Sequence, residues 1–572
     1  MNKRRLIARM PCAVAVIALV GVSMAGLSNS HAAADRQQAV AAAYALTKTS
    51  ITFMGVQREY HEYAPTNVAA LREHDARGVK VVISLHDNQQ ASEVNAQRTG
   101  WPALAEQHGF IALFPAAANG TWNTTHDANR TDDIEFVRTV AAAARAKYGL
   151  PSTIATYLTG VGAGATMAQE IAMRSPSTAT GVAAIDGVAE AATLALPQGA
   201  LPPSAMAVWQ LRPLPTPLSV REQAQLDYWR KANAATGAHV RSAGAGRVQT
   251  LIYAAPDNPV QSVRMSTLNA SPGDTLAISK MVWDDMFSRV VRFPDHTKTN
   301  GTLHADQTIA SMGLIETVKE LQPGTPRRWL TYVPPQYASL VAAGKKLPLI
   351  FSFHGRNGSA RFQALISQWH SVAADAGFIV VYPHGLGATW TTSIAADNRD
   401  VQFFLDMFAD LKATYQIDTE RVFLNGSSQG TALTNRIAVQ YPELFASIAP
   451  CYSGHLSAAS YANPIVKTGV PLPVWQCRGV EELPSEFPGG TAGETAARNF
   501  WRETVNKNFG PPTVQIDGRR TTEVWSDGVA EYRWQLTADL GHFWHPGQAR
   551  KMWDEMLSKY RRTADGGLFR VD

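Results

Sequence analysis

The chain contains one short turn twice, as Leu424-Asn425-Gly426-Ser427-Ser428-Gln429-Gly430 and, earlier, as Leu158-Thr159-Gly160-Val161-Gly162-Ala163-Gly164. In both stretches an apolar strand enters a tight turn that opens a helix, with glycines two residues on either side of a central position. Such a strand–turn–helix elbow exposes the central side chain at the end of a buried strand. The central residue is Ser428 in the later copy and Gly162 in the earlier one. Only the later copy can therefore supply a nucleophile at this position.

The repeat continues on both sides of the elbow, in the same order along the chain. The apolar runs Val81–Leu85 and Leu349–Phe353, for example, are each followed by a histidine. In both copies such runs alternate with amphipathic segments of helical period, which is typical of a mostly parallel sheet covered by helices on both faces. We therefore expect a degenerate domain at residues 35–295, a junction at 296–323 and a catalytic domain at 324–572.

The N-terminus carries the three parts of an export signal. Four cations precede the apolar run Cys12–Leu27, and no acidic residue lies before or within it. The small-residue stretch Ala32-Ala33-Ala34 follows the run. This order predicts a secretory signal peptide over residues 1–34, cut after Ala34. The alternative, a membrane anchor, is disfavoured because the run is short for a bilayer span. We expect a secreted or periplasmic protein with no membrane partner after cleavage.

Composition is that of a globular protein, with 45% hydrophobic and 17% charged residues. The formal net charge is +5, but four of the positive charges lie in the predicted signal. The remaining chain is close to neutral, so its charge does not favour nucleic acid as a partner.

The chain after the predicted signal contains two cysteines, Cys451 and Cys477. We expect them on neighbouring strands, where a disulfide can form, and an oxidising compartment permits one. Two buried free thiols are equally compatible with the sequence. Neither cysteine is assigned a catalytic role.

A base and an acid that could activate Ser428 follow it along the chain. A serine hydroxyl needs a base to accept its proton, and we expect this base to be His542, just before the last helix, rather than His545 on the same loop. The acid should follow the strand that begins at Val474, and we prefer Glu482 to Glu481. Its task is to accept the Nδ1 proton of the histidine and hold the ring in one tautomer.

Two backbone N–H groups are expected to form an oxyanion hole, those of Gln429 and of Arg356 in the loop His354-Gly355-Arg356-Asn357-Gly358. Three aromatic residues on the same predicted sheet edge either line a substrate pocket or simply pack: Trp390, Tyr452 and Trp544. No metal or cofactor is expected, because no cluster of His, Cys or Asp has ligand spacing.

Several motifs between about 325 and 560 resemble those of the polyhydroxybutyrate depolymerase and feruloyl esterase family of secreted α/β hydrolases. They include Val381-Tyr382-Pro383, the Ser428 elbow and Gly541-His542-x-Trp544. The resemblance implies that this part of the chain is a serine esterase of the α/β-hydrolase fold, acting on polyester or plant cell-wall esters. Together with the repeat, it leads us to expect two tandem α/β-hydrolase-like domains, of which the second is the esterase. The acid loop departs from the family pattern His-Gly-x-x-Asp, since it reads Arg478-Gly479-Val480-Glu481-Glu482, and Arg356 stands where the family often has a cysteine.

The earlier copy lacks all three catalytic residues. Gly162 replaces the serine, Thr216 falls opposite Glu482, and Pro272 or a neighbour falls opposite His542. We expect a pseudo-hydrolase domain that packs on the active one, binds substrate or caps the cleft; an independent chemistry from Asp87, His86 and Asp133 is the minor alternative. For the whole chain we expect a carboxylic-ester hydrolase with a small or polymeric ester as substrate. The alternatives are an acyltransferase with the same triad and a non-catalytic binding protein.

Overall fold

The structure is a computed structural model that describes residues 44–571, except 152–153, 198, 203, 214–215, 238, 243–248 and 269–274. Residues Leu46–Asp572 form one compact unit. The predicted export signal and Pro272 lie outside the described residues. Among the residues that are described, no helix is both long enough and apolar enough to cross a membrane.

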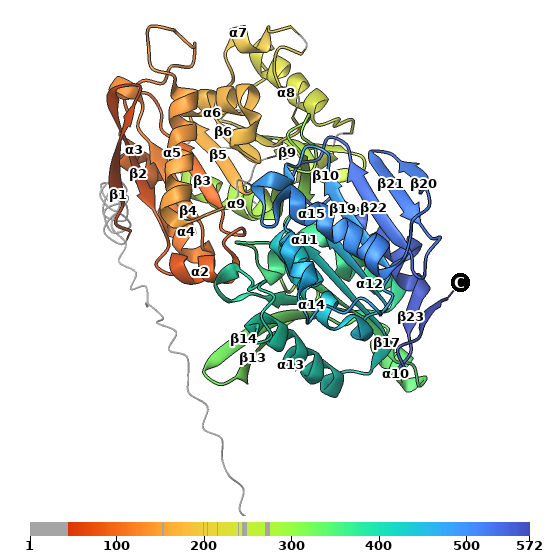
Figure 1. Ribbon diagram of the computed structural model, residues 1–572. Coiled ribbons are helices and arrows are strands. Elements are labelled where there is room, and N and C mark those ends of the chain that lie inside the picture. The colour runs from red at the N-terminus through yellow and green to blue at the C-terminus, as the bar shows by residue number, and fades with distance from the viewer. Residues whose placement is uncertain are drawn as a thin grey trace, which may run out of the picture. The chain divides into compact units, whose positions relative to one another are not determined.

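Two ten-stranded sheets with the same strand order make up the described part of the chain (Figure 1). The first has the order β1-β2-β4-β3-β5-β6-β7-β10-β9-β8, and the second has the order β13-β14-β16-β15-β17-β18-β19-β22-β21-β20. In both sheets the strands from the third to the eighth in this order run parallel, and the outer ones are antiparallel. The predicted fold class, two mostly parallel α/β sheets, is confirmed.

The first half, residues 46–305, contains the first sheet. Its strands are β1 (Thr47–Phe53), β2 (Val56–Tyr63), β3 (Val81–Leu85), β4 (Ile111–Pro115), β5 (Thr156–Val161), β6 (Gly181–Ile185), β7 (Ala207–Arg212), β8 (His239–Ser242), β9 (Gln249–Ala255) and β10 (Asn258–Thr267). Its helices are α2 (Val68–Asp75), α3 (Ser92–Thr99), α4 (Trp101–His108), α5 (Asp133–Tyr148), α6 (Ala163–Arg174), α7 (Ala191–Leu194), α8 (Val220–Ala232) and α9 (Thr275–Asp285). A small two-stranded sheet of β11 (Val290–Phe293) and β12 (Thr302–Ala305) follows.

The second half, residues 314–571, contains the second sheet. Its strands are β13 (Leu314–Gln322), β14 (Thr325–Tyr332), β15 (Leu347–Phe353), β16 (Ile379–His384), β17 (Ile417–Ser427), β18 (Ser447–Cys451), β19 (Val474–Gly479), β20 (Thr513–Asp517), β21 (Arg520–Trp525) and β22 (Tyr532–Thr537). Its helices are α10 (Tyr337–Ala342), α11 (Ala360–Ser367), α12 (Trp369–Ala376), α13 (Arg399–Thr414), α14 (Gln429–Gln440), α15 (Gly490–Asn499) and α16 (Gln548–Glu555). The short pair β23 (Tyr560–Arg562) and β24 (Leu568–Arg570) ends the chain.

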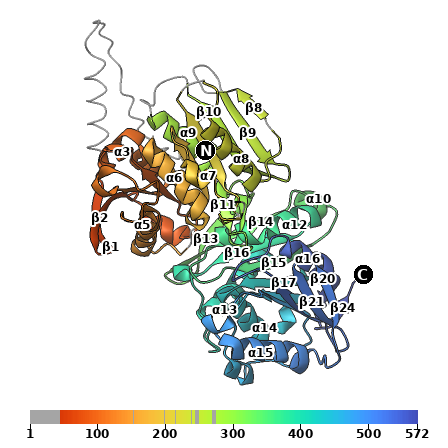
Figure 2. The same cartoon turned by 90° about the horizontal axis from the view of Figure 1, so that it is seen from above.

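Helices cover both faces of the second sheet: Figure 2 shows α13, α14 and α15 on one side and α12 and α16 on the other. A strand between two helical layers is buried on both faces, which explains the continuous apolar runs. Every residue of β15 is buried, as is every residue of β3 in the first sheet. The segment 296–323, expected to be a junction, contains β12 and β13, and β13 pairs with β14. The second sheet therefore begins before Gly324.

A buried ion pair recurs at the same place in both halves. Arg58 donates to Asp133 at 2.8 Å, and Arg327 donates to Asp400 at 2.6 Å. The N-cap of α13 is Asn398, whose Oδ1 accepts the N–H groups of Asp400 and Val401. The side chain of Asp400 is engaged by Arg327 and by the N–H of Thr391.

The start of α11 is tied to the end of α2 by buried polar contacts. Asp75 accepts hydrogen bonds from Ser359 Oγ and Arg361 Nη1, both at 2.8 Å. Arg361 also pairs with Asp306, which Lys80 contacts from the first half. Since Asp75 and Asp306 are both almost fully enclosed, these pairs hold α2 in a defined place beside α11.

Candidate active site

The backbone of the elbow is the same in the two halves. Ser428, between β17 and α14, has φ +57° and ψ −122°, and Gly162 has φ +56° and ψ −122°. Positive φ is costly for a residue with a side chain, so Ser428 holds a strained conformation. The flanking glycines are required by space: a Cβ on Gly426 would lie 2.2 Å from the carbonyl oxygen of Gly430, and one on Gly430 would lie 2.3 Å from that of Phe353.

His542 and Glu482 are joined by a short hydrogen bond, with Nδ1 of the ring 2.6 Å from Oε1 of the carboxylate. Glu482 is 3% exposed, whereas its rival Glu481 is exposed. Phe487 stacks on the His542 ring, with the two ring centroids 3.8 Å apart. His545 is engaged elsewhere, because its Nδ1 lies 2.6 Å from the carbonyl oxygen of Pro546. Of the two pairs of candidates that the sequence left open, His542 and Glu482 are the members that lie in contact with each other.

The carboxylate of Glu482 is kept ionised by its partners. Burial is the largest influence and raises its pKa, but the hydrogen bonds with His542 and with the N–H of Ser453 outweigh burial, so the net pKa lies below the ordinary value. An ionised carboxylate on Nδ1 directs the ring proton to that nitrogen and leaves Nε2 as the acceptor.

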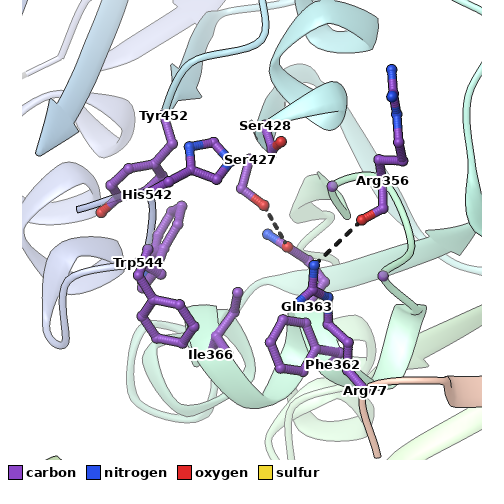
Figure 3. Close-up of a pocket in the computed structure, with 13 residues that line it drawn as sticks. Arg77, Arg356, Phe362, Gln363, Ile366, Ser427, Ser428, Tyr452, His542 and Trp544 are labelled. Atoms are coloured by element: carbon purple, nitrogen blue, oxygen red, sulfur yellow. Dashed lines mark hydrogen bonds between the residues drawn. The ribbon is translucent and has the colours of Figure 1, made fainter. Parts of the chain in front are cut away.

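Ser428 and His542 line one pocket at the carboxyl ends of the parallel strands (Figure 3). The other lining residues are Arg77, Gly355, Arg356, Gly358, Phe362, Gln363, Ile366, Ser427, Tyr452, Phe543 and Trp544. Two of the three predicted aromatic residues, Tyr452 and Trp544, are therefore in the lining. Trp390 is not: it is buried behind the pocket, and its Nε1 donates to the carbonyl oxygen of His354 at 2.7 Å.

In the first half, a carboxylate lies at the place that corresponds to the oxyanion hole expected in the second half. Asp87 occupies the position of Gly355, because Leu85 pairs with Gly160 as Phe353 pairs with Gly426. Its Oδ1 accepts the N–H of Ala163 at 2.9 Å and the N–H of Asn88 at 2.8 Å.

These two donors correspond to the N–H groups of Gln429 and Arg356 in the second half. There the residue opposite Asp87 is Gly355, which has no side chain to fill the space. A helix N-terminus with free N–H groups favours a negative oxygen. The equivalent groups of the second half correspond, by strand register, to the two that hold a carboxylate oxygen in the first.

The same aspartate closes the elbow of the first half. A Cβ on Gly162 would lie 2.4 Å from Asp87 Oδ1, so a serine does not fit beside this carboxylate. The residues named for an independent chemistry are bound in place: Asp133 by Arg58, and His86 by the N–H of Ala117, which donates to its Nε2 at 2.9 Å.

A disulfide joins Cys451 of β18 to Cys477 of β19, with Cα atoms 4.6 Å apart. This resolves the choice left open by the sequence, and the expectation of neighbouring strands is confirmed. Cys451 directly precedes the pocket residue Tyr452, so the bridge fixes the strand end that carries this side of the pocket.

Some site residues carry no sequence signal. Phe487, which stacks on His542, belongs to no motif, and the N–H of Ser453 that holds Glu482 is a backbone group. Arg77 reaches the pocket from the first half of the chain, far from every motif of the second.

Residues 365–461 match the Prolyl oligopeptidase family. The chain is also similar to a bifunctional acetylxylan esterase/xylanase of Neocallimastix patriciarum, at 31% identity over 24% of this chain and 19% of that protein. A probable acetylxylan esterase A of Neosartorya fischeri is 32% identical over 23% of this chain and 36% of that protein. Feruloyl esterase B of Talaromyces funiculosus is 29% identical over 25% of this chain and 42% of that protein.

The chain spans less than half the length of each of these three relatives. Among solved structures, an acetyl xylan esterase from Aspergillus awamori aligns over 42% of this chain and 97% of that chain, with 18% identity and a TM-score of 0.34. The sequence relatives are acetylxylan and feruloyl esterases, in agreement with the esterase resemblance of the motifs. The polyhydroxybutyrate depolymerase part of that resemblance remains a prediction.

Proposed function

We propose that the second half is a serine carboxylic-ester hydrolase with Ser428 as nucleophile, His542 as base and Glu482 as the acid that orients it. The observation that carries the proposal is the hydrogen bond between His542, which lines the pocket that the strained Ser428 also lines, and the buried carboxylate of Glu482. A buried carboxylate that holds one tautomer of a histidine near a serine is the arrangement that makes a hydroxyl nucleophilic.

The reaction then proceeds through an acyl-enzyme. Ser428 Oγ attacks the ester carbonyl carbon and passes its proton to His542 Nε2, and the carbonyl oxygen becomes an oxyanion that accepts the N–H groups of Gln429 and Arg356. The C–O bond breaks, and the alcohol leaves with the proton from His542. Water, deprotonated by the same histidine, then attacks the acyl group and releases the acid and Ser428.

The first half supports the assignment of the oxyanion hole. Asp87 shows that two N–H groups at this elbow can share one negatively charged oxygen, each at hydrogen-bond distance. We infer that the first half is itself catalytically inactive, because its elbow has glycine at the nucleophile position and its hole is filled by a side chain.

The similar proteins and the motif resemblance suggest which substrates to test. Feruloyl or acetyl esters of plant polysaccharides are the substrates to test first, since the names of the relatives refer to such esters. Oligoesters of hydroxy acids are the second class, from the motif resemblance. We also infer secretion or periplasmic export from residues 1–34.

Hydrolysis of 4-nitrophenyl butyrate and methyl ferulate tests the proposal. Ser428→Ala should abolish turnover of whichever ester is cleaved. Ser427→Ala is the matched control, because it removes a hydroxyl one residue away that donates to Gln363 at 2.9 Å, and it should retain far more activity. Turnover that survives in Ser428→Ala would overturn the assignment of the nucleophile, and no turnover by the wild type would favour a non-catalytic binding protein. Transfer to an added alcohol in preference to water would identify an acyltransferase.

A further inference from the structure

Arg77 brings a cation from the first half into the pocket of Ser428 and His542 (Figure 3). It lies two residues after α2, whose last residue, Asp75, is held by Ser359 and Arg361 at the start of α11. The pocket of the second half is therefore completed by a residue of the first, and the anchored end of α2 sets the place of that residue.

The guanidinium of Arg77 has weak partners. Its Nη2 donates to the carbonyl oxygen of Arg356 at 3.5 Å, and its Cζ lies 5.1 Å from the centroid of the Phe362 ring. Within the described residues, no carboxylate oxygen lies within 4.0 Å of its nitrogens, since Asp75 is taken up by Arg361 and Ser359. Arginine stays protonated in proteins, so a positive charge with unused donors lies in the pocket.

None of the lining residues that the structure describes carries a carboxylate. Asp75 attracts the guanidinium from outside the lining, but burial outweighs this attraction and lowers the pKa of Arg77. The one carboxylate of the site, Glu482, is bound to His542 and Ser453. The side chain of Arg356 points away from the pocket in Figure 3, so it adds no second cation there. Phe362, Ile366 and Trp544 provide apolar walls. A ligand that fits has an apolar or aromatic body and a negatively charged group at one end.

We propose that Arg77 is a specificity residue through which the first half makes the site of the second prefer esters with a free carboxylate on the acyl group. The inference rests on the proposed esterase activity and adds its substrate class. A guanidinium binds a carboxylate through two parallel N–H···O bonds, and in a pocket shielded from water such a pair discriminates strongly against a neutral analogue.

The test compares two esters of the same chain length, mono-4-nitrophenyl glutarate and 4-nitrophenyl pentanoate, which differ by a carboxylate in place of a methyl group. The wild type should hydrolyse the glutarate ester with the higher kcat/KM. The quantity compared is the ratio of kcat/KM for the glutarate ester to kcat/KM for the pentanoate ester, and Arg77→Gln should lower this ratio about 10- to 100-fold. Arg77→Lys, which keeps the charge without the planar fork, should give an intermediate ratio. Because both rates come from one protein sample, partial unfolding of a variant cancels in the ratio.

Arg72→Gln is the matched control: it removes the same charge from the exposed side of α2, and its ratio should equal that of the wild type. Two results would overturn the proposal: an unchanged ratio in Arg77→Gln, or an equal fall of the ratio in Arg72→Gln. A wild type that hydrolyses neither ester, nor any other ester tried, would contradict the proposed function itself and not only this extension of it.

Discussion

Gly355→Asp would copy the carboxylate of the first half into the site of the second. Asp87 occupies the corresponding position and accepts two N–H groups with one oxygen. The backbone allows the change, since Gly355 does not have the positive φ that only glycine readily adopts. An aspartate there should occupy the N–H groups of Gln429 and Arg356, which would then be unable to bind the oxyanion.

The expected loss can be worked out from the donors involved. One oxyanion donor contributes about 3 kcal/mol to transition-state stabilisation, so two captured donors correspond to about 6 kcal/mol, or a fall in kcat of about 10⁴-fold. Crowding adds to this, because a Cβ at position 355 would lie 2.9 Å from the Cβ of Ser428.

Two variants separate capture from crowding and from charge alone. Gly355→Ala adds the Cβ but no acceptor and should lose much less activity; Asn357→Asp adds a charge on the same exposed loop and should lose least. The assay is kcat on 4-nitrophenyl butyrate, with thermal unfolding as a check of folding. The reasoning is refuted if Gly355→Asp stays within tenfold of the wild type, or if Gly355→Ala is equally damaging.

Four further outcomes are expected. Glu482→Gln should lower kcat by about 10³- to 10⁴-fold with little change in KM, because the neutral amide no longer holds the required tautomer; steady-state kinetics measure this, and a loss under tenfold would exclude Glu482 as the acid. Gly162→Ser should lower the free energy of unfolding by about 1–3 kcal/mol through contact with Asp87, and Asp87→Gly should relieve part of this loss in urea titrations. In a Ser428→Ala background Gly162→Ser should give no turnover, and measurable turnover would contradict an inactive first half. Stability should also fall in acid. Burial lowers the pKa of His354, His370 and His455 to about 4 and that of His384 to about 2. Unfolding therefore takes up protons below about pH 6.5, and the free energy of unfolding should decrease from there towards pH 4. A urea midpoint that does not change over this range would show that these rings are not neutral in the fold.

Local signals explain why the fold could be predicted from the sequence. Burial of β3 and β15 on both faces requires continuous apolar runs, and the tight turn at Ser428 requires glycines beside it. Both requirements are met by residues close together in the chain, so they can be recognised in the sequence. His542 could be proposed because the order of strands and loops brings the end of the chain to the same sheet edge.

Burial and long-range contacts set the limits of that prediction. Glu481 and Glu482 are indistinguishable in sequence, and they differ only because one is enclosed beneath Ser453. Trp390 sits at the expected sheet edge, but its indole N–H turns inward to the carbonyl oxygen of His354, which no pattern indicates. Arg77 depends on how α2 packs on α11, through contacts between residues nearly 300 positions apart.

The carboxylate of Asp87 also bears on the evolution of the first half. A serine at position 162 alone meets that carboxylate, and a glycine at position 87 alone brings no nucleophile, so neither single substitution creates a reactive elbow. On the proposal that the first half is an inactive copy of the second, this carboxylate acts as an evolutionary ratchet against recovery of a nucleophile. Selection on the first half would then act on what it contributes as a neighbour, through the position of α2, and not on a reaction of its own.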